Sequence, residues 1–211
     1  MEFSGKIKAS EVAYIKFQIS GKLASVNCKI GDTVKKGQLL ATLEKTELQA
    51  YLERALKEYD LERALFDEKQ KQELTEYEKR KYQDSLDISV KNVEIAKANL
   101  NATDLYSSIE GIVTEMDPGQ PGENITPAGF VITVVNPKSL FFEGELPEEE
   151  LSQTSVGQPV KVSLKAFPDK TFEGKIEKIG FSPLKEGIFP VFVSLSNLSD
   201  LRLGLTGKAT F

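Results

Sequence analysis

One short motif occurs twice in this chain, on either side of a long segment that contains no glycine or proline. The first copy runs from Gly21 to Leu43 and the second from Gly111 to Val135. Each copy is typical of a strand, a turn with glycine beside an acidic residue, a second glycine turn and another strand. One copy alone is too small to bury its apolar face, so we expect the two copies to pack together as a single β body.

The segment between the copies predicts two helices. It is rich in residues that favour helix, and Thr75 followed by Glu78 matches a capping box, which predicts a new helix start. An antiparallel hairpin is favoured over one continuous helix of about 55 residues, whose apolar stripe would have no partner. The stripe recurs in steps of three and four, as in a coiled coil, and comprises Leu48, Leu52, Ala55, Tyr59, Phe66, Tyr82, Leu86, Val93, Ala96 and Leu100.

The last third of the chain predicts a small β-barrel or sandwich. Polar and apolar residues alternate over 160–164, 172–176 and 191–195, with glycine and proline turns between these stretches.

Composition excludes several classes of chemistry. The chain has no histidine, which excludes Ser-His-Asp and Cys-His catalysis. Its single cysteine, Cys28, is expected to be a small core residue. The net charge of -5 argues against nucleic-acid binding. We therefore expect no enzyme, no catalytic, metal or cofactor-binding residues and no nucleic-acid partner.

The order of these motifs resembles the periplasmic adaptor, or membrane fusion protein, family of hemolysin-D-like and RND/ABC efflux subunits. Three stretches carry the resemblance. Residues 20–40 resemble the family's first lipoyl-like half, and residues 98–113 resemble its junction from helix to second half. Leu203–Gly207 resembles a Leu-x-x-Gly-Met-x-Gly strand, with Leu205 where methionine is commoner.

The resemblance implies a mixed α and β, elongated fold in which a split lipoyl-like β domain carries an inserted antiparallel helical hairpin and is followed by a small β-barrel. The expected division is edge strands of a membrane-proximal domain over 1–19, the first lipoyl-like half over 20–46, the hairpin over 47–103, the second half over 104–137, the barrel over 138–202 and the start of a membrane-proximal domain over 203–211.

The same resemblance implies a non-enzymatic adaptor that couples an inner-membrane efflux or export transporter, ABC or RND, to an outer partner such as an outer-membrane channel. It further implies a homo-oligomer, hexameric in the full assembly. The location would be periplasmic or extracytoplasmic. No apolar run is long enough to span a membrane, so we expect the membrane anchor to lie outside these 211 residues.

Two candidate partner-binding sites follow from the resemblance. The hairpin tip is expected to dock the outer partner through Gln70, Lys71, Gln72, Glu73, Leu74 and Thr75. However, the Arg-x3-Leu-x6-Ser pattern of TolC-docking adaptors is absent, because Asp67 follows Arg63 and Asp84 follows Arg80 at the leucine position. This leaves open another channel, an exporter without an outer membrane, or a solvated tip without a partner.

The second candidate is Gln120, in a loop of the second half. In macrolide-exporter-type adaptors a comparable glutamine lines a gating ring on the sixfold axis. An ordinary turn glutamine is the alternative interpretation.

Two alternative functions were weighed. A lipoyl or biotin carrier would present a lysine between the two halves, but Glu47 occupies that position. Lys45 is out of register, and we expect it to be a solvated surface lysine. The other alternative is a free-standing coiled-coil interaction module.

Overall fold

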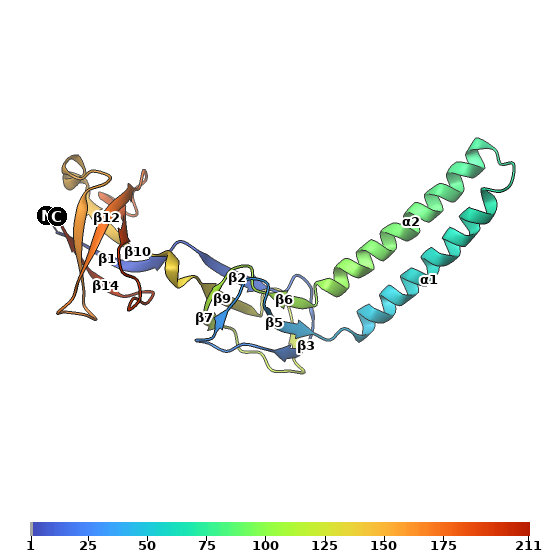
Figure 1. Ribbon diagram of the computed structural model, residues 1–211, viewed down its shortest axis with the longest axis horizontal. Helices are drawn as coiled ribbons and strands as arrows, with labels where there is room; N and C mark the ends of the chain where they lie inside the picture. The colour runs from blue at the N-terminus through green and yellow to red at the C-terminus, as the bar shows by residue number, and fades with distance from the viewer. Residues whose placement is uncertain (1) are drawn as a thin grey trace. The chain divides into compact units, whose positions relative to one another are not determined.

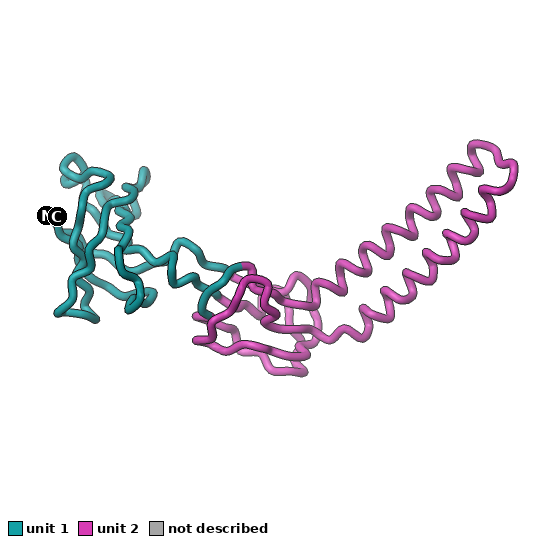
Figure 2. Tube along the Cα trace, viewed as in Figure 1, with its two compact units in different colours: residues 1–13, 109–112, 134–211 teal, residues 14–108, 113–133 magenta. Residues whose placement is uncertain are grey.

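The computed structural model describes residues 2–211 and divides the chain into two compact units (Figures 1 and 2). Of the described residues, unit 1 contains 2–13, 109–112 and 134–211, and unit 2 contains 14–108 and 113–133. Each unit is therefore built from segments that are far apart in the sequence.

Unit 1 contains a closed six-stranded barrel. Its neighbouring strands pair antiparallel, and the circuit closes where the last strand of the chain pairs with the first. Around the barrel the order is β1 (Glu2–Ala9), β10 (Leu140–Pro147), β13 (Ile188–Leu195), β12 (Thr171–Ile179), β11 (Pro159–Leu164) and β14 (Thr206–Thr210). Two 3-10 turns, η1 (Pro137–Ser139) and η2 (Glu148–Gln153), flank β10.

The alternation in the sequence sets the barrel core. Along β11, Val160, Val162 and Leu164 are buried while Lys161 and Ser163 are exposed. The other strands add apolar side chains to the same core, among them Phe3, Ile7, Phe142, Leu146, Ile176, Val191 and Val193. The predicted barrel is thus confirmed, and its interior is a packed apolar core.

The two chain ends correct the expected domain division. We expected residues 1–19 and 203–211 to lie in a membrane-proximal domain, but β1 and β14 are strands of the barrel. Gly5 in β1 lies opposite Gly207 in β14. The prediction was wrong because six strands are needed to close this sheet, and residues 138–202 supply only four of them.

The two copies of the sequence motif form two facing four-stranded sheets that exchange their shortest strands. One sheet has the order β2 (Val12–Lys16), β9 (Val131–Val135), β7 (Gly111–Met116) and β4 (Thr33–Val34). The other has the order β6 (Asp104–Tyr106), β5 (Leu39–Leu43), β3 (Gly21–Val26) and β8 (Asn124–Ile125). The first copy's β4 thus completes the sheet of the second copy, and β8 completes the sheet of the first.

Backbone hydrogen bonds repeat around this exchange. Leu23 accepts from the amide of Gly122 (2.7 Å) and donates to the carbonyl of Glu123 (2.8 Å). Its counterpart Val113 accepts from Gly31 (2.8 Å) and donates to Asp32 (2.9 Å). The predicted packing of the two copies as pseudo-symmetric partners is therefore confirmed.

The glycines of the two exchanging turns occupy matching conformations. Gly31 has φ +94° and Gly122 has φ +99°, both in the left-handed region that residues with a Cβ rarely adopt. This explains why the sequence repeats a glycine at these two positions.

The inserted segment forms a helical hairpin, α1 (Thr46–Lys69) and α2 (Glu76–Asn101). Two helices, and not one continuous helix, are thus confirmed. Half-buried or buried residues recur along both helices in steps of three and four, including Glu62 and Ser89, which the apolar pattern alone did not show. Among the described residues, no helix is long and apolar enough to cross a bilayer.

Candidate partner-binding sites

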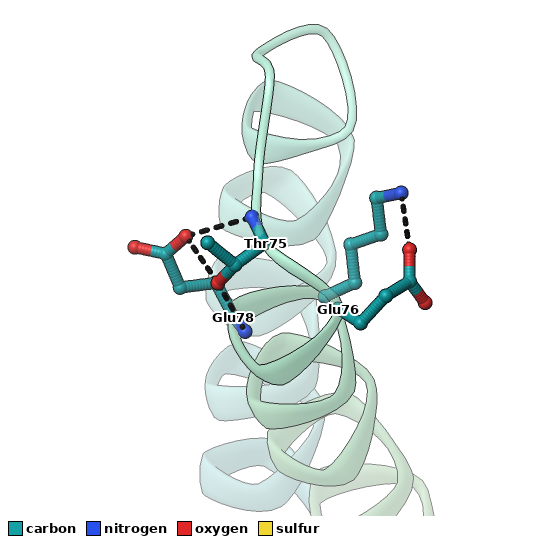
Figure 3. A network of polar contacts seen from close by, with 4 residues as sticks. Thr75, Glu76 and Glu78 are labelled. Carbon is teal, nitrogen blue, oxygen red and sulfur yellow. Dashed lines mark hydrogen bonds and ion pairs between the residues drawn. The ribbon is translucent and has the colours of Figure 1, made fainter.

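The hairpin tip is shaped by the capping box that starts α2. The Thr75 hydroxyl accepts from the Glu78 amide (3.3 Å), and the Glu78 carboxylate accepts from both the amide (2.9 Å) and the hydroxyl (2.8 Å) of Thr75. Figure 3 shows these contacts beside the ion pair of Glu76 with Lys79 (2.8 Å). Hydrogen bonds from the Thr75 side chain and backbone lower the pKa of the Glu78 carboxyl.

The predicted tip residues do lie together in the turn between the helices. Backbone hydrogen bonds continue past α1 into the turn, from Gln70 to Phe66 (2.9 Å) and from Gln72 to Lys69 (3.0 Å). Of the six predicted residues only Leu74 is half-buried, and the others are exposed. The tip therefore offers polar side chains on a turn whose backbone is fixed at both ends.

A cavity of about 830 Å³ lies beside the tip. Its apolar lining comes from Phe66, Leu74, Tyr77 and Tyr82, and charged residues of both helices complete the wall. Tyr77 is 78% exposed. This combination of an aromatic hollow and a polar rim has the composition of a protein-binding surface.

Gln120 is exposed in the turn that carries Gly122. Its backbone amide donates to the Glu123 carboxylate (3.0 Å), just as the backbone amide of Lys29 donates to the Asp32 carboxylate (2.9 Å) in the other copy. The acidic residue of each motif therefore fixes its own turn. The side chain of Gln120 is left available for a contact outside the turn.

The hairpin base corrects the prediction for Lys45. Its ammonium donates to the Asp104 carboxylate (2.7 Å), and its side chain is only 33% exposed, so it is not a freely solvated lysine. Sequence reasoning missed this pair because its members are 59 positions apart. The pair ties the residue before α1 to the first residue of β6 after α2. Glu47, where a carrier would place its modified lysine, lies in the first turn of α1.

Sequence reasoning also missed β2 as part of the split sandwich. A signal was present, because Val12–Lys16 precedes the first motif as Asp104–Tyr106 precedes the second.

Among the described residues, no group of three or more acidic or cysteine side chains could hold a metal ion. The Glu148–Glu150 run forms the first turn of η2.

A split sandwich with an inserted hairpin, followed by a closed barrel, defines a class of modular adaptor domains. Residues 11–136, more than half of the chain, match the family of CzcB-like, barrel-sandwich hybrid domains, and residues 140–181 match the CusB-like beta-barrel domain. The chain belongs to this family, that of the membrane fusion, or periplasmic adaptor, proteins.

Relatives and solved structures agree with this assignment. The chain is 26% identical over 98 residues to the colistin resistance protein EmrA of Acinetobacter baumannii. The aligned stretch covers 46% of this chain and 27% of that protein. The alignments thus span about a quarter of the curated relatives. The membrane fusion protein Spr0693 of Streptococcus pneumoniae R6 has the same fold, with a TM-score of 0.83, 23% identity and coverage of 100% and 97% of the two chains.

A further structure with this fold is a MacA-MexA chimera that contains the Pseudomonas aeruginosa MexA α-hairpin domain. Its TM-score is 0.89 at 20% identity, with coverage of 99% of this chain and 80% of the chimera. The expected mixed α and β fold, with hairpin, split sandwich and barrel, is confirmed by this likeness.

Proposed function

We propose that this chain is the extracytoplasmic core of an adaptor subunit, which links an inner-membrane efflux or export transporter to an outer partner. The observation that carries the proposal is the split sandwich, whose halves exchange strands on either side of an inserted hairpin. Membership in the family supports it, as does a relative named as a multidrug export protein, EmrA of Haemophilus influenzae. The transporter supplies the energy, and this chain binds the transporter and the outer partner and couples the two.

The hairpin tip docks the outer partner in this proposal. The exposed tip side chains, the fixed turn and the neighbouring aromatic cavity support that role. The partner is either a channel other than TolC or a component of an exporter without an outer membrane, since the TolC-docking pattern is absent from the sequence.

Six copies form a ring in the full assembly, with the Gln120 loops facing the common axis. An exposed glutamine on a turn that is held by its own glutamate fits a ring of this kind. Because Cys28 is the sole cysteine and is buried, a Cys28→Ser background makes Gln120→Cys a clean probe. Thiol cross-linking in cells should give covalent dimers, because each chain then carries a single thiol. A strictly monomeric product would show that Gln120 does not face the common axis.

Site-specific photo-cross-linking of the full-length protein in its own cells tests the adaptor function. A photoreactive residue at Phe181, fully exposed on the barrel, should capture a membrane transporter, and mass spectrometry of the adduct identifies it as ABC or RND. A residue at Gln72 should capture the outer partner. If Phe181 captures no transporter, the adaptor function is wrong.

A functional test isolates the tip. Replacing Gln72 and Leu74 with glycine should abolish export and leave the barrel and the split sandwich folded. Unchanged export would show that the tip has no docking role. The adaptor function would then still be decided by whether cross-linking from Phe181 captures a transporter.

A further inference from the structure

The loop between β12 and β13, residues 180–187, carries the most exposed large apolar side chain among the described residues. Phe181 is 100% exposed, and Leu184 in the same loop is 51% exposed. A phenylalanine in this environment adds no burial to the folding of the barrel. Phe181, Leu184 and the exposed Pro183 between them form an apolar loop tip. Apolar patches with polar surroundings are typical of surfaces that another molecule covers.

The base of the loop is held in place by the barrel. The backbone amide of Leu184 donates to the Ile188 carbonyl (2.8 Å), which closes the turn into β13. The ammonium of Lys185 donates to the Glu145 carboxylate on β10 (2.7 Å). The apolar loop tip is therefore presented from a fixed base, so a partner that binds it loses little free energy in ordering the loop.

The 3-10 turn η2 lies beside this loop. β10 ends at Pro147, which is opposite Ile188, the first residue of β13, so η2 follows β10 at the same end of the barrel. The backbone amide of Glu148 donates to the carbonyl of Gly187 (2.9 Å), which joins η2 directly to the loop. The two segments thus form one surface.

This surface has an excess of negative charge. Three exposed carboxylates have no partner among the described residues, namely Glu148, Glu149 and Glu186. The neighbouring lysines do not neutralise them, because Lys185 is paired with Glu145 and Lys178 lies over the ring of Phe192 (5.8 Å). The apolar loop tip is thus bordered by free acidic groups.

The charge decides between the possible occupants of this surface. A bilayer with anionic lipids attracts basic segments and repels acidic ones. A second copy of the same surface would bring like charges together, which disfavours association. A protein surface that surrounds an apolar pocket with lysine or arginine satisfies both the apolar loop tip and the carboxylates.

We propose that the apolar loop tip and the three glutamates dock on an extracytoplasmic surface of the transporter, at an apolar pocket with a basic rim. The inference rests on the proposed function and adds the chemistry of this one contact. Phe181 enters the pocket as the apolar anchor. Glu148, Glu149 and Glu186 pair with the basic rim, which orients the two proteins and makes their association dependent on salt.

The test uses the full-length protein, purified in detergent from its own cells, and the membrane transporter that co-purifies with it and is identified by mass spectrometry. The transporter is placed in lipid nanodiscs, and the Kd for the full-length protein is measured. Phe181→Ala should weaken binding about tenfold or more, because one buried phenylalanine is lost. Glu149→Lys and Glu186→Lys should each weaken it about fivefold, and salt at about 0.5 M should weaken the unaltered protein several-fold.

Two control variants change the same chemistry at the other end of the barrel. Asp169 lies in the turn before β12, whereas the loop with Phe181 follows β12. Leu203 is 40% exposed and precedes Gly204, whose amide donates to Ile7 (2.9 Å). Asp169→Lys and Leu203→Ala should leave the Kd unchanged.

The outcomes separate this proposal from the adaptor function. If the transporter co-purifies but Phe181→Ala binds it as tightly as the unaltered protein, the docking surface is wrong and the adaptor function stands. Tighter binding by the two lysine variants also overturns the proposal. So does equally tight binding to nanodiscs of zwitterionic or anionic lipid without transporter, which would assign the loop to the bilayer. If no transporter co-purifies with the unaltered protein, the adaptor function fails and this proposal fails with it.

Discussion

At the scale of single residues, Thr75 and Glu78 decide where α2 begins. The three-residue spacing could be recognised in the sequence because a capping box depends only on neighbours along the chain. The structure forms both halves of the box. In contrast, α1 begins at Thr46, after an N-cap residue, Lys45, that makes no side-chain cap hydrogen bond, so the two helices of the hairpin start with unequal local support.

Thr75→Ala should therefore destabilise the start of α2 by about 1 kcal/mol, because the hydroxyl that accepts from the Glu78 amide and donates to the Glu78 carboxylate is lost. Amide hydrogen exchange in the first turn of α2 measures the effect. Thr46→Ala, at the uncapped start of α1, is the matched control and should change exchange far less. Equal effects at the two sites would contradict the role of the cap.

The same box makes the tip sensitive to acid. Thr75 lowers the pKa of Glu78 below its ordinary value of 4.5. A carboxyl with a lowered pKa in the folded state stabilises the fold fully above the unfolded value, and this contribution is lost as the pH falls through the lower folded pKa. The start of α2 should thus fray only below about pH 4.5. Carbon-13 titration of the Glu78 carboxyl measures the pKa, which should rise toward 4.5 in Thr75→Ala. An unchanged pKa in that variant would rule out Thr75 as the cause.

At the scale of elements, local patterns predicted the repeated strands, the hairpin and its turn. The long-range pairings were not predictable in this way. Lys45 meets Asp104 across the whole hairpin, and β1 meets β14 across nearly the whole chain. Neither pairing leaves a periodic signal, because each depends on where the fold brings distant segments. For the candidate sites, the tip residues were predictable as a turn, whereas the Lys45–Asp104 pair at the hairpin base was not.

The hairpin seam offers a sharper test of its packing. Ala96 is fully buried on α2, while Ala98, two positions later, is exposed. Ala96→Glu should place an unpaired carboxylate in the seam and cost about 3 kcal/mol. Ala98→Glu adds the same charge on the opposite face and should be nearly neutral. Helical circular dichroism during urea unfolding compares the two, and equal midpoints would argue against a packed seam at Ala96.

At the scale of the whole molecule, the two ends of the chain close the barrel. β14 pairs with β1 on one side and with β11 on the other. Without β14, both of these strands would expose unpaired backbone groups, and an open sheet edge invites association with another chain. Gly207 shows how closely the closing strand fits, since a Cβ there would lie 2.2 Å from the carbonyl oxygen of Ser163.

Ending the chain after Leu205 should therefore open the barrel and cause aggregation, measured by light scattering and by loss of amide protection in β1 and β11. Ending it after Thr210 keeps every residue of β14 and removes only Phe211, so this control should stay monodisperse, with a modest loss of stability from the contact of Phe211 with Phe3. The hairpin should keep its helical signal in both truncations, because its seam is built from α1 and α2. If the shorter chain keeps protected β1 and β11 strands, barrel closure by β14 is not what holds these strands in place.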